Sequence, residues 1–343
     1  MKVMIVGSDK VYAIENFYVK HFRASGISVD HFTAQAAFYN YYQKSLLNKL
    51  IYKAGLSTII RKINQSFIQE VRKVMPDVVW VFKGMEISPS SLRKVKAMGV
   101  ALANYNPDNP FIFTGKGSGN SFVTRSIDLY DLHFTYNLAV EKMLKERQGS
   151  KTAFLPFGFE ISEDLYNDCA QQQEIVKACF LGNPDKQRAT FIEALAERGI
   201  SIDVYGNHWN RYVRHASVTI FQPVYGDELW RTLRKYRVQL NMMRVHNEDS
   251  HNMRTFEVPG VGGIMVAPST PEHLLFFKNG VEAFFYHDAN ECAEIISKLL
   301  AIDIPAAESI RQHARNASLQ KKYEYKYRAA EALGVLKQLV HYK

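Results

Sequence analysis

Short apolar runs alternate with helical segments along almost the whole chain, and this alternation limits the fold more than any other feature of the sequence. The clearest run is 77–83 (Asp-Val-Val-Trp-Val-Phe-Lys), whose apolar, β-branched centre predicts a strand buried on both faces. Ser88 and Pro89 follow in the N-cap and first-turn order that begins a helix. Strands that alternate with helices form parallel sheets covered on both sides. The sequence therefore predicts an α/β fold.

The alternation pauses once, near the middle of the chain. Strands are expected at 2–8, 28–33, 77–83, 100–105, 132–136 and 152–157 before the pause, and at 176–181, 201–205, 218–221, 238–243, 264–267 and 283–286 after it. The pause begins at 155–160, and a polar segment continues to about residue 174. We therefore predict two doubly wound, Rossmann-like domains in tandem, one at 1–158 and one at 159–343. The last helix is a candidate to pack back on the N-terminal domain.

The composition excludes some classes of protein. Of 343 residues, 47% are hydrophobic and 22% are charged, which is typical of a soluble globular protein. No apolar run approaches the roughly 20 residues that span a bilayer, and the N-terminus reads as a buried strand rather than a signal peptide. Cys169, Cys179 and Cys292 show neither a disulfide framework nor metal-ligand spacing. We therefore expect a cytoplasmic protein.

The net charge of +9 permits an anionic partner. Nucleic acid, anionic lipid and a phosphorylated substrate all fit, and the charge alone does not distinguish them. One stretch, 44–73, concentrates this charge around interleaved apolar residues and has Glu70 as its single acid. Its basic residues are Lys44, Lys49, Lys53, Arg61, Lys62, Arg72 and Lys73. Such a helix suits the anionic inner face of a membrane; a solvated face over a core helix is the alternative.

Ligands of open parallel sheets bind beyond the carboxyl ends of the strands. Four of the six candidate loops lie in the second half of the chain, which is therefore expected to hold a nucleotide. The six are Gly7-Ser8, 106–110, 182–185, Tyr205-Gly206, Met243-Arg244 and 249–263. Gly182 allows a ligand to approach the backbone, and Lys186 and Arg188 are placed to neutralise phosphate oxygens. The alternative is a tight turn with two solvated basic residues.

The stretch 249–263 reads as a loop, a short helix that begins near 250–252, and a Gly-rich break before the apolar run 264–267. Asp249 precedes the helix and Glu257 lies inside it. A helix N-terminus presents free N–H groups that suit a phosphate, and a carboxylate further along can accept hydrogen bonds from sugar hydroxyls. An ordinary amphipathic helix with a solvated Glu257 is the alternative.

Other sequence features indicate which cofactors the chain is not expected to bind and which residues are candidates for catalysis. The first strand is not followed by G-x-G-x-x-G, and the chain has neither a Walker A sequence nor an Asp-x-Asp metal motif. Asp108, in a turn at a strand end, is a candidate catalytic base, with ordinary turn chemistry as the alternative. His251 is better placed for acid–base chemistry than His246 or His273, although a structural or solvated histidine is the alternative.

Several motifs together resemble the CgeB-like glycosyltransferases, a spore-maturation family of the GT-B architecture. This resemblance implies that the two Rossmann-like domains face each other across a cleft. The C-terminal ones are Cys179-Phe-Leu-Gly-Asn-Pro, Arg254-Thr-Phe-Glu257-Val-Pro-Gly-Val-Gly-Gly263, Pro271-Glu-His-Leu-Leu-Phe-Phe and Ala283-Phe-Phe-Tyr. The N-terminal ones are Asp77-Val-Val-Trp-Val-Phe-Lys, Asn104-Tyr-Asn-Pro-Asp108-Asn-Pro-Phe and Thr152-Ala-Phe-Leu-Pro-Phe-Gly. The similarity extends over most of the chain.

The resemblance implies an enzyme that transfers a sugar from a nucleotide-diphosphate donor to a glycan, lipid or protein acceptor, without metal, cofactor or nucleic acid. Glu257 corresponds to the second Glu of the E-x7-E pattern of related retaining enzymes and is expected to bind the ribose. The first position of that pattern is Asp249 here, which leaves the stereochemical outcome open.

The expected roles follow from the strand-end loops and the resemblance together. The diphosphate is expected to lie against Gly182, Asn183, Lys186, Arg188 and the segment Asn252, Met253, Arg254 and Thr255. Tyr205 and Gly206 are expected to flank the base, Gly7 and Ser8 to contact the acceptor, and Asp108, Asp249 and His251 are the catalytic candidates. A nucleotide-sugar epimerase or phosphorylase on the same architecture, or a noncatalytic protein that binds nucleic acid or membranes, are the alternatives.

Overall fold

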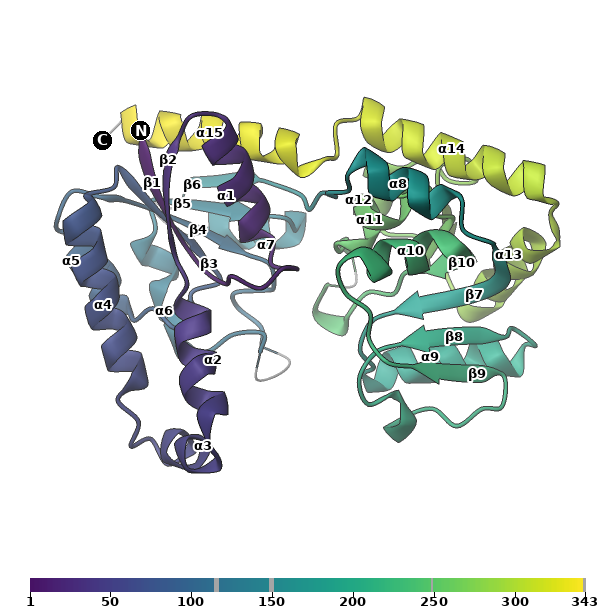
Figure 1. Ribbon diagram of the computed structural model, residues 1–343, viewed down its shortest axis with the longest axis horizontal. Helices are drawn as coiled ribbons and strands as arrows, with labels where there is room; N and C mark the ends of the chain where they lie inside the picture. The colour runs from purple at the N-terminus through teal and green to yellow at the C-terminus, as the bar shows by residue number, and fades with distance from the viewer. Residues whose placement is uncertain (114–116, 148–150, 248, 342–343) are drawn as a thin grey trace. The chain divides into compact units, whose positions relative to one another are not determined.

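The computed structural model describes residues 1–113, 117–147, 151–247 and 249–341 (Figure 1). The chain forms two compact units. Unit 1 comprises Met1–Pro156 together with the C-terminal segment from Tyr325, and unit 2 comprises Phe157–Glu324. The domain boundary predicted from the sequence lies two residues later. The last helix, which the sequence suggested as a candidate to pack on the N-terminal domain, belongs to unit 1. None of the helices in the described ranges is both long and apolar enough to cross a membrane.

Unit 1 contains a six-stranded parallel sheet with the order β2-β1-β3-β4-β5-β6. Its strands are β1 (Lys2–Val6), β2 (Ser28–Phe32), β3 (Val78–Phe82), β4 (Ala101–Asn106), β5 (Leu132–Thr135) and β6 (Lys151–Phe154). The order reverses between β1 and β3, where Val3 pairs with Val78. Connections leave these two strands in opposite directions, so the loops beyond their carboxyl ends are free to form a ligand site.

Helices cover both faces of this sheet. On one face, α1 (Glu15–Ala24) packs along α15 (Tyr325–His341), with Phe17 stacked on Tyr325 at 4.5 Å between ring centroids. On the other face, Phe67 of α4 (Ile59–Val74) and Leu92 of α5 (Pro89–Lys96) pack in one core cluster with the strands. The remaining helices are α2 (Ala34–Lys44), α3 (Leu46–Lys53), α6 (Ser121–Ser126), η1 (Ile127–Leu129) and α7 (Leu138–Lys145).

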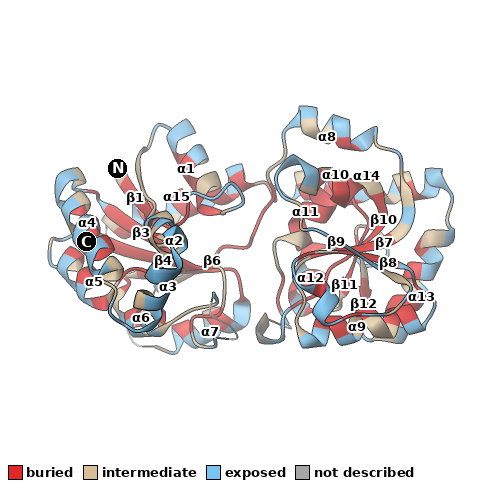
Figure 2. Ribbon diagram, turned by 60° about the horizontal axis from the view of Figure 1, so that its bottom comes forward, coloured by how far each residue is buried: buried red, intermediate tan, exposed pale blue. Residues whose placement is uncertain are grey.

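Unit 2 contains a second six-stranded parallel sheet, with the order β12-β11-β10-β7-β8-β9. Counted from its own first strand, this is the 3-2-1-4-5-6 order of dinucleotide-binding folds, with the reversal between β7 and β10. The strands are β7 (Ile175–Leu181), β8 (Ile202–Tyr205), β9 (Val218–Phe221), β10 (Tyr236–Leu240), β11 (Met265–Pro268) and β12 (Phe284–Tyr286). Figure 2 shows the buried strands at the centre of each unit.

The helices of unit 2 enclose a core that contains the side chains of β7, β8 and β10 together with Ile192, Leu195 and Ile296. They are α8 (Glu163–Ala170), α9 (Lys186–Glu197), η2 (Trp209–Arg211), α10 (Asp227–Lys235), η3 (Val245–Asn247), α11 (Arg254–Gly260), α12 (Pro271–Phe276), α13 (Ala289–Ala301) and α14 (Ile304–Gln320). The α/β fold with two doubly wound sheets, expected from the alternation, is confirmed.

Two expected helices differ from the structure. The helical periodicity of residues 46–75 predicts one continuous helix, but the structure divides this stretch into α3 and α4, because Gly55 adopts a left-handed backbone (φ 74°) that ends α3. The helix expected from 250–252 begins at Arg254: Met253 already has a helical backbone (φ −58°, ψ −38°), and Asn252 before it is held by hydrogen bonds to the side chains of Thr255 and Asn241. Ser88, by contrast, caps α5 as expected, its hydroxyl accepting a hydrogen bond from the N–H of Ser91.

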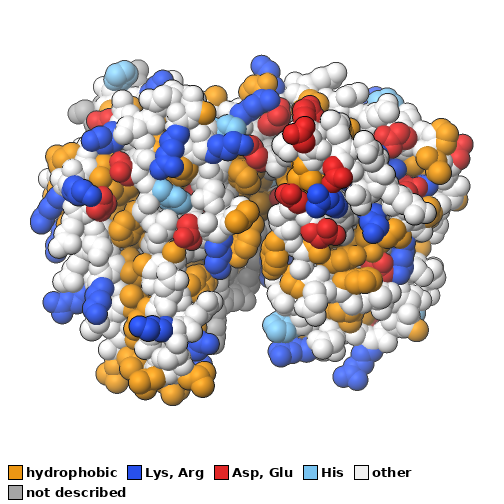
Figure 3. All heavy atoms as spheres, in the orientation of Figure 1, with side chains coloured by type: hydrophobic (Ala, Val, Ile, Leu, Met, Phe, Trp, Pro, Cys, Tyr) orange, Lys and Arg blue, Asp and Glu red, His pale blue; other side chains and the backbone are white. Residues whose placement is uncertain are grey.

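Helix α3 leaves apolar side chains in solvent. Leu46, Leu47 and Leu50 on α3 and Leu56 beyond it are all exposed. Figure 3 shows hydrophobic side chains gathered where α3 forms the tip of unit 1, with Lys and Arg side chains beside them.

Candidate functional site

The loops that follow β7 and β8 are packed tightly together at the carboxyl end of the unit 2 sheet. The N–H of Gly182 donates to the carbonyl of Tyr205 at 2.9 Å. A Cβ added to Gly206 would lie 2.3 Å from the carbonyl oxygen of Gly182, so only glycine fits there. The backbone of both loops is therefore fixed beside the point where the strand order reverses.

The predicted phosphate loop continues into α9 through a conventional N-cap. Asp185 caps the helix and accepts from the N–H of Arg188 at 3.0 Å. The amide oxygen of Asn183 accepts from the N–H of Asn207 at 2.9 Å, which adds a second link to the loop after β8. Asn183 and Lys186 are exposed, so Lys186 is free to approach an anion from solvent.

Arg188 has a different position from the one expected of a solvated phosphate ligand. Its guanidinium is buried and donates to the carbonyls of Met242 (2.7 Å), Met243 (3.3 Å) and Asn183 (3.1 Å). Burial and the nearby charge of Arg244 lower its pKa to about 10, so it remains a cation at neutral pH. Arg188 therefore joins the loops beyond β7 and β10 across the reversal point, and it places a positive charge under them.

The segment before α11 is held by a polar network that reaches β10 and α12. Asn252 donates from its side chain to Asn241 Oδ1 at 2.7 Å, and Asn241 donates to Thr255 Oγ1 at 3.2 Å. Thr255 Oγ1 lies 3.0 Å from His273 Nε2. Because Nδ1 of His273 must donate to the carbonyl of Pro268 (2.7 Å), a neutral ring accepts at Nε2 from the Thr255 hydroxyl. Burial lowers the pKa of His273 to about 4, which is consistent with that neutral ring.

His251 lies in the core of unit 2 rather than on a surface that a substrate could reach. It is fully buried. Nδ1 lies 2.5 Å from Glu272 Oε2, and Nε2 accepts from the N–H of Phe157 at 3.4 Å. With both ring nitrogens engaged, His251 positions the start of α11, and the direct catalytic role expected from the sequence is corrected. The side chain of His246 lies outside the described part of the structure.

Arg254 and Glu257 form an ion pair on one side of α11. The carboxylate of Glu257 accepts from Nη1 of Arg254 and is only 5% exposed, so the alternative of a solvated glutamate is excluded. Nε of Arg254 is buried and has no hydrogen-bond partner. Within the described ranges, the N–H groups of Met253 and Arg254 also lack an acceptor. Unused donors therefore gather at the start of α11 beside a held carboxylate.

The guanidinium of Arg254 was not predicted to have a role, since the sequence pattern pointed only to the backbone N–H groups there. The i, i+3 spacing of Arg254 and Glu257 was the available signal.

Two other predicted residues lie nearer the surface. Asp249 precedes the polar network in the sequence, and its side chain is exposed. Tyr205 is half buried and stacks on Phe221 with 4.8 Å between ring centroids, and its hydroxyl lies 2.9 Å from that of Tyr236.

In unit 1, the loop after β1 is built around a buried carboxylate. The N–H of Ser8 donates to Glu15 Oε1 at 2.5 Å, and a Cβ on Gly7 would lie 2.4 Å from the same oxygen. Burial raises the pKa of Glu15, although backbone hydrogen bonds and the charge of Lys83 oppose the shift. Gly7 and Ser8 therefore follow the first strand, as expected, and contact Glu15 beside the point where the strand order of this sheet reverses.

Asp108 is paired with a lysine from the neighbouring strand end. Nζ of Lys83 lies 2.5 Å from Asp108 Oδ2 and also donates to the carbonyl of Gly117. Lys83 has a left-handed backbone (φ 62°), which costs energy for a residue other than glycine. Strain of this kind often marks functional loops.

Glu86 is a second buried carboxylate at this edge, and it was not predicted from the sequence. It is 9% exposed and follows β3 in the same loop as Lys83. Burial raises its pKa to about 7, against a backbone hydrogen bond and the charge of Lys83. The side chain of Asn64 fixes this loop by donating to the carbonyl of Glu86 (2.9 Å) and accepting from the N–H of Ser88 (2.8 Å). A lone glutamate between apolar residues was the only sequence signal.

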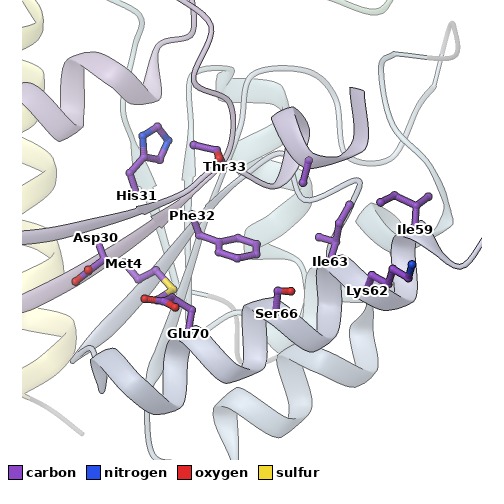
Figure 4. A pocket seen from close by; sticks show the side chains of 11 residues that line it. Met4, Asp30, His31, Phe32, Thr33, Ile59, Lys62, Ile63, Ser66 and Glu70 are labelled. Carbon is purple, nitrogen blue, oxygen red and sulfur yellow. The ribbon is translucent and has the colours of Figure 1, made fainter. Parts of the chain in front are cut away.

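A cavity of about 380 Å³ in unit 1 is lined by residues of β1, β2 and α4, and it reaches the carboxyl end of β2 at Phe32 and Thr33. Figure 4 shows Ser66 and Glu70 of α4 opposite Asp30 and Met4 of the strands. None of the residues predicted from the sequence for a donor or an acceptor lines it. Among the residues that the structure describes, no cluster of His, Cys, Asp or Glu is arranged to hold a metal ion.

Residues 186–334 match the family described as "Glycosyl transferase-like", a range that begins at α9, includes α10 to α14 and ends within α15. No curated protein matches the chain. Solved structures that resemble it include sucrose-phosphate synthase from Thermosynechococcus elongatus, with a TM-score of 0.70 and 13% identity over 100% of both chains. HepE from Anabaena, solved with UDP and glucose, has a TM-score of 0.63 and 14% identity over 98% of this chain and 99% of that chain.

A putative UDP-N-acetylglucosamine 2-epimerase from Listeria monocytogenes also shares the fold, with a TM-score of 0.58 and 11% identity over 100% of this chain and 97% of that chain. At these identities the likeness concerns architecture. The chain therefore has the GT-B fold seen in glycosyltransferases, and its residues 186–334 match a glycosyl transferase-like family.

Proposed function

We propose that this GT-B enzyme transfers a sugar from a nucleotide-diphosphate donor, bound by unit 2, to an acceptor hydroxyl bound at the strand ends of unit 1. The observation that supports this most is the start of α11, where Arg254, with its unsatisfied Nε, lies beside the buried carboxylate of Glu257. This segment lies within the matched domain. A cation and free N–H groups suit a diphosphate, and a carboxylate suits ribose hydroxyls.

In this reaction the bond between the sugar and the diphosphate breaks, a bond between the sugar and the acceptor oxygen forms, and the hydroxyl proton leaves. Negative charge grows on the departing diphosphate. We propose that Lys186 and Arg254 stabilise it directly and that Arg188 does so through the loops it joins. Cations fixed before the reaction act more strongly on the transition state than on the ground state.

On the acceptor side, we propose that Lys83 and Asp108 orient the acceptor and that Glu86 receives its proton. Lys83 and Glu86 share the loop beyond β3, and Asp108 follows β4. A carboxylate held near neutral pKa is suited to accept a proton at physiological pH. Gly7 and Ser8 complete this edge, because Glu15 fixes their backbone.

Two further features belong to the proposal. The resemblance of the motifs favours a CgeB-like member of the superfamily, and turnover is expected to need no divalent metal because cations of the chain neutralise the diphosphate. Product release measured in excess EDTA tests the second point. A complete loss of activity that manganese or magnesium restores would contradict it.

The deciding experiment is calorimetry with UDP, GDP, ADP and dTDP, followed by an assay of nucleotide release from the matching nucleotide sugars. Binding of one nucleotide that Arg254→Ala weakens at least tenfold is expected. An enzyme that interconverts two nucleotide sugars without releasing nucleotide would instead be an epimerase, the alternative that the Listeria structure keeps open on grounds of fold. Failure of a folded protein to bind any nucleotide or nucleotide sugar would overturn the donor site.

A further inference from the structure

Helix α3 is fixed on unit 1 by one face only. Ser45 caps it by accepting from the N–H of Asn48 at 3.0 Å, and the side chain of Asn48 donates to the carbonyl of Tyr41 at 2.8 Å. Tyr52 packs edge-on against Phe38 of α2, with 5.0 Å between ring centroids. These contacts set the orientation of α3, so the opposite face is held toward solvent.

That opposite face is apolar. Leu46 is 77% exposed, Leu47 and Leu50 are each 63% exposed, and Leu56 beyond the helix is 75% exposed. Leu46 and Leu50 are four residues apart and so lie on the same side of the helix. Isolated exposed leucines are ordinary on protein surfaces, but a contiguous group at one tip marks an interaction surface (Figure 3).

The charges around these leucines have one sign. The stretch 44–69 contains no acidic residue. Its basic side chains are Lys44, Lys49, Lys53, Arg61 and Lys62, and within the described structure none of them forms an ion pair. Four of the five are exposed, and Lys49 lies over the ring of Tyr42 at 5.8 Å. Their full positive charge therefore faces solvent around the leucines.

We propose that the α3 tip, formed by Leu46, Leu47, Leu50 and Leu56 with the surrounding basic residues, docks unit 1 onto an anionic lipid bilayer. Leucines can enter the boundary between headgroups and acyl chains while the lysine and arginine ends stay with the lipid phosphates. A second copy of this chain is a poorer partner, because two tips would bring like charges together. The docking surface does not depend on the sugar-transfer reaction.

Two signals contribute to the binding. Each basic side chain near an anionic surface contributes about 1 kcal/mol, equivalent to roughly a fivefold change in partitioning. Each leucine that leaves water adds about tenfold or more. Neither signal alone anchors a protein firmly, so the combination predicts reversible binding that weakens in high salt.

The test is flotation of the purified protein with phosphatidylcholine vesicles that contain or lack phosphatidylglycerol. Wild type is expected to float with anionic vesicles only. Leu46→Gln with Leu50→Gln, and separately Lys44→Gln, Lys53→Gln, Arg61→Gln and Lys62→Gln together, should each lower binding at least tenfold. Leu274→Gln with Leu275→Gln is the matched control, because these leucines are 53% and 61% exposed in unit 2 and should not contribute.

The use of two separate variants keeps the test decisive even if one of them is destabilised. The mutated side chains are exposed, so thermal unfolding should be unchanged; if the leucine variant melts lower, the charge variant alone decides. Wild type that ignores anionic vesicles, or variants that bind as wild type does, would overturn the proposal. Loss of a concentration-dependent dimer in the leucine variant, without vesicle binding by wild type, would assign the tip to a second copy and overturn it equally.

Discussion

Glu257 is the residue on which the proposed donor site depends most directly, and the substitution Glu257→Gln tests how much its negative charge contributes to nucleotide binding. The amide keeps the size of the side chain but weakens the pairing with Arg254 and turns one acceptor into a donor. Charged hydrogen bonds contribute roughly 1.5–3 kcal/mol each, so nucleotide affinity should fall about tenfold to a hundredfold. The free energy of unfolding should fall by about 1–3 kcal/mol, because Arg254 loses its partner. Calorimetry and thermal unfolding measure the two effects.

Glu331→Gln is the control for this substitution. Glu331 also lies three residues after an arginine, Arg328, on a helix outside the donor site, with 3.7 Å between the charged groups. Its replacement should leave nucleotide affinity unchanged. If Glu257→Gln lowers stability but binds nucleotide as wild type does, Glu257 is a structural residue of α11.

Glu86 should make the stability of the protein depend on pH near neutrality. Burial raises its pKa from 4.5 to about 7, so between these values the folded state holds a proton that the unfolded state has released. The free energy of unfolding must therefore fall as pH rises through this window, by up to roughly 3 kcal/mol, and then level off above about pH 7. Glu15 shifts in the same direction, so a comparison of variants is needed to separate the two.

Glu86→Gln should remove its part of this slope and raise stability at pH 8, because no charge then has to be buried. Denaturant unfolding at pH 5, 6, 7 and 8 measures the effect. If Glu86 receives the acceptor proton, the variant should also lose the acidic limb of the activity profile. Parallel stability curves for wild type and variant would show that Glu86 titrates normally.

At the level of single residues, sequence patterns predicted the loop or helix in which a residue lies better than they predicted its contacts. Gly182 and Glu257 could be placed because each lies at a fixed distance from a strand or helix signal in its own neighbourhood. The burial of His251 could not, since its partner Glu272 is 21 residues away and meets it only after α12 packs. Glu86 was missed for the same reason, because its unusual pKa results from surroundings that the sequence does not display.

Among the elements, the connection that Arg188 makes between the loops after β7 and β10 can be broken by Arg188→Met. Methionine fills similar space but leaves the carbonyls of Met242, Met243 and Asn183 without their donor. The hydrogen bonds to Met242 and Met243 are buried, and a buried unsatisfied group costs about 1–3 kcal/mol, so the free energy of unfolding should fall by roughly 2–6 kcal/mol. Nucleotide affinity should fall as well, since both loops border the proposed diphosphate.

The matched control is Arg198→Met, just beyond the other end of α9. Arg198 is exposed and donates to the side chain of Asn290 at 2.7 Å and the carbonyl of Ala194 at 2.6 Å. Its loss should cost less than about 1 kcal/mol. Equal melting of the two variants would contradict the joining role of Arg188.

The boundaries of helices could be predicted where the signal is local and not where it comes from tertiary contacts. Ser88 caps α5 through its own neighbours, and the cap is visible in the sequence. The late start of α11 depends on Asn241, which lies 11 residues before its partner Asn252. The helix α2 was not predicted, because its tyrosine-rich sequence has weak helix propensity and is ordered by packing against α3 and α4.

For the whole molecule, alternation along the sequence was enough to predict two parallel sheets but not the order of their strands. Both reversal points arise from the direction in which each connection crosses the sheet, which periodicity does not record. The chain enters unit 2 at Phe157 and leaves it at Glu324, so α15 completes unit 1 from the far end of the sequence. The stacking of Phe17 on Tyr325 is one of the contacts responsible.

Stability in acid should be governed in part by Glu174, which joins three elements of unit 2. Its carboxylate accepts from Nε (2.6 Å) and Nη2 (2.5 Å) of Arg237 and from Arg311. Arg237 in turn donates to the carbonyl of Ile302 at 2.7 Å, so the cluster links β10, α14 and the end of α13. Burial pushes the pKa of Glu174 up, but the two arginines outweigh burial and hold the pKa below 4.5.

Because the folded state lowers this pKa, the stabilisation is complete above about pH 4.5 and disappears as pH falls through the lower folded value. Glu174→Gln leaves the buried guanidinium of Arg237 without its charged partner and leaves Arg311 with Glu308 at 3.7 Å, so at pH 7 the free energy of unfolding should fall by about 3–5 kcal/mol. The difference from wild type should shrink as pH drops below about 4.5. Glu294→Gln, which breaks an exposed pair with Lys298, should cost less than about 1 kcal/mol at every pH. Urea unfolding of the three proteins from pH 3 to 7 measures this, and a wild-type advantage that persists unchanged at pH 3 would contradict it.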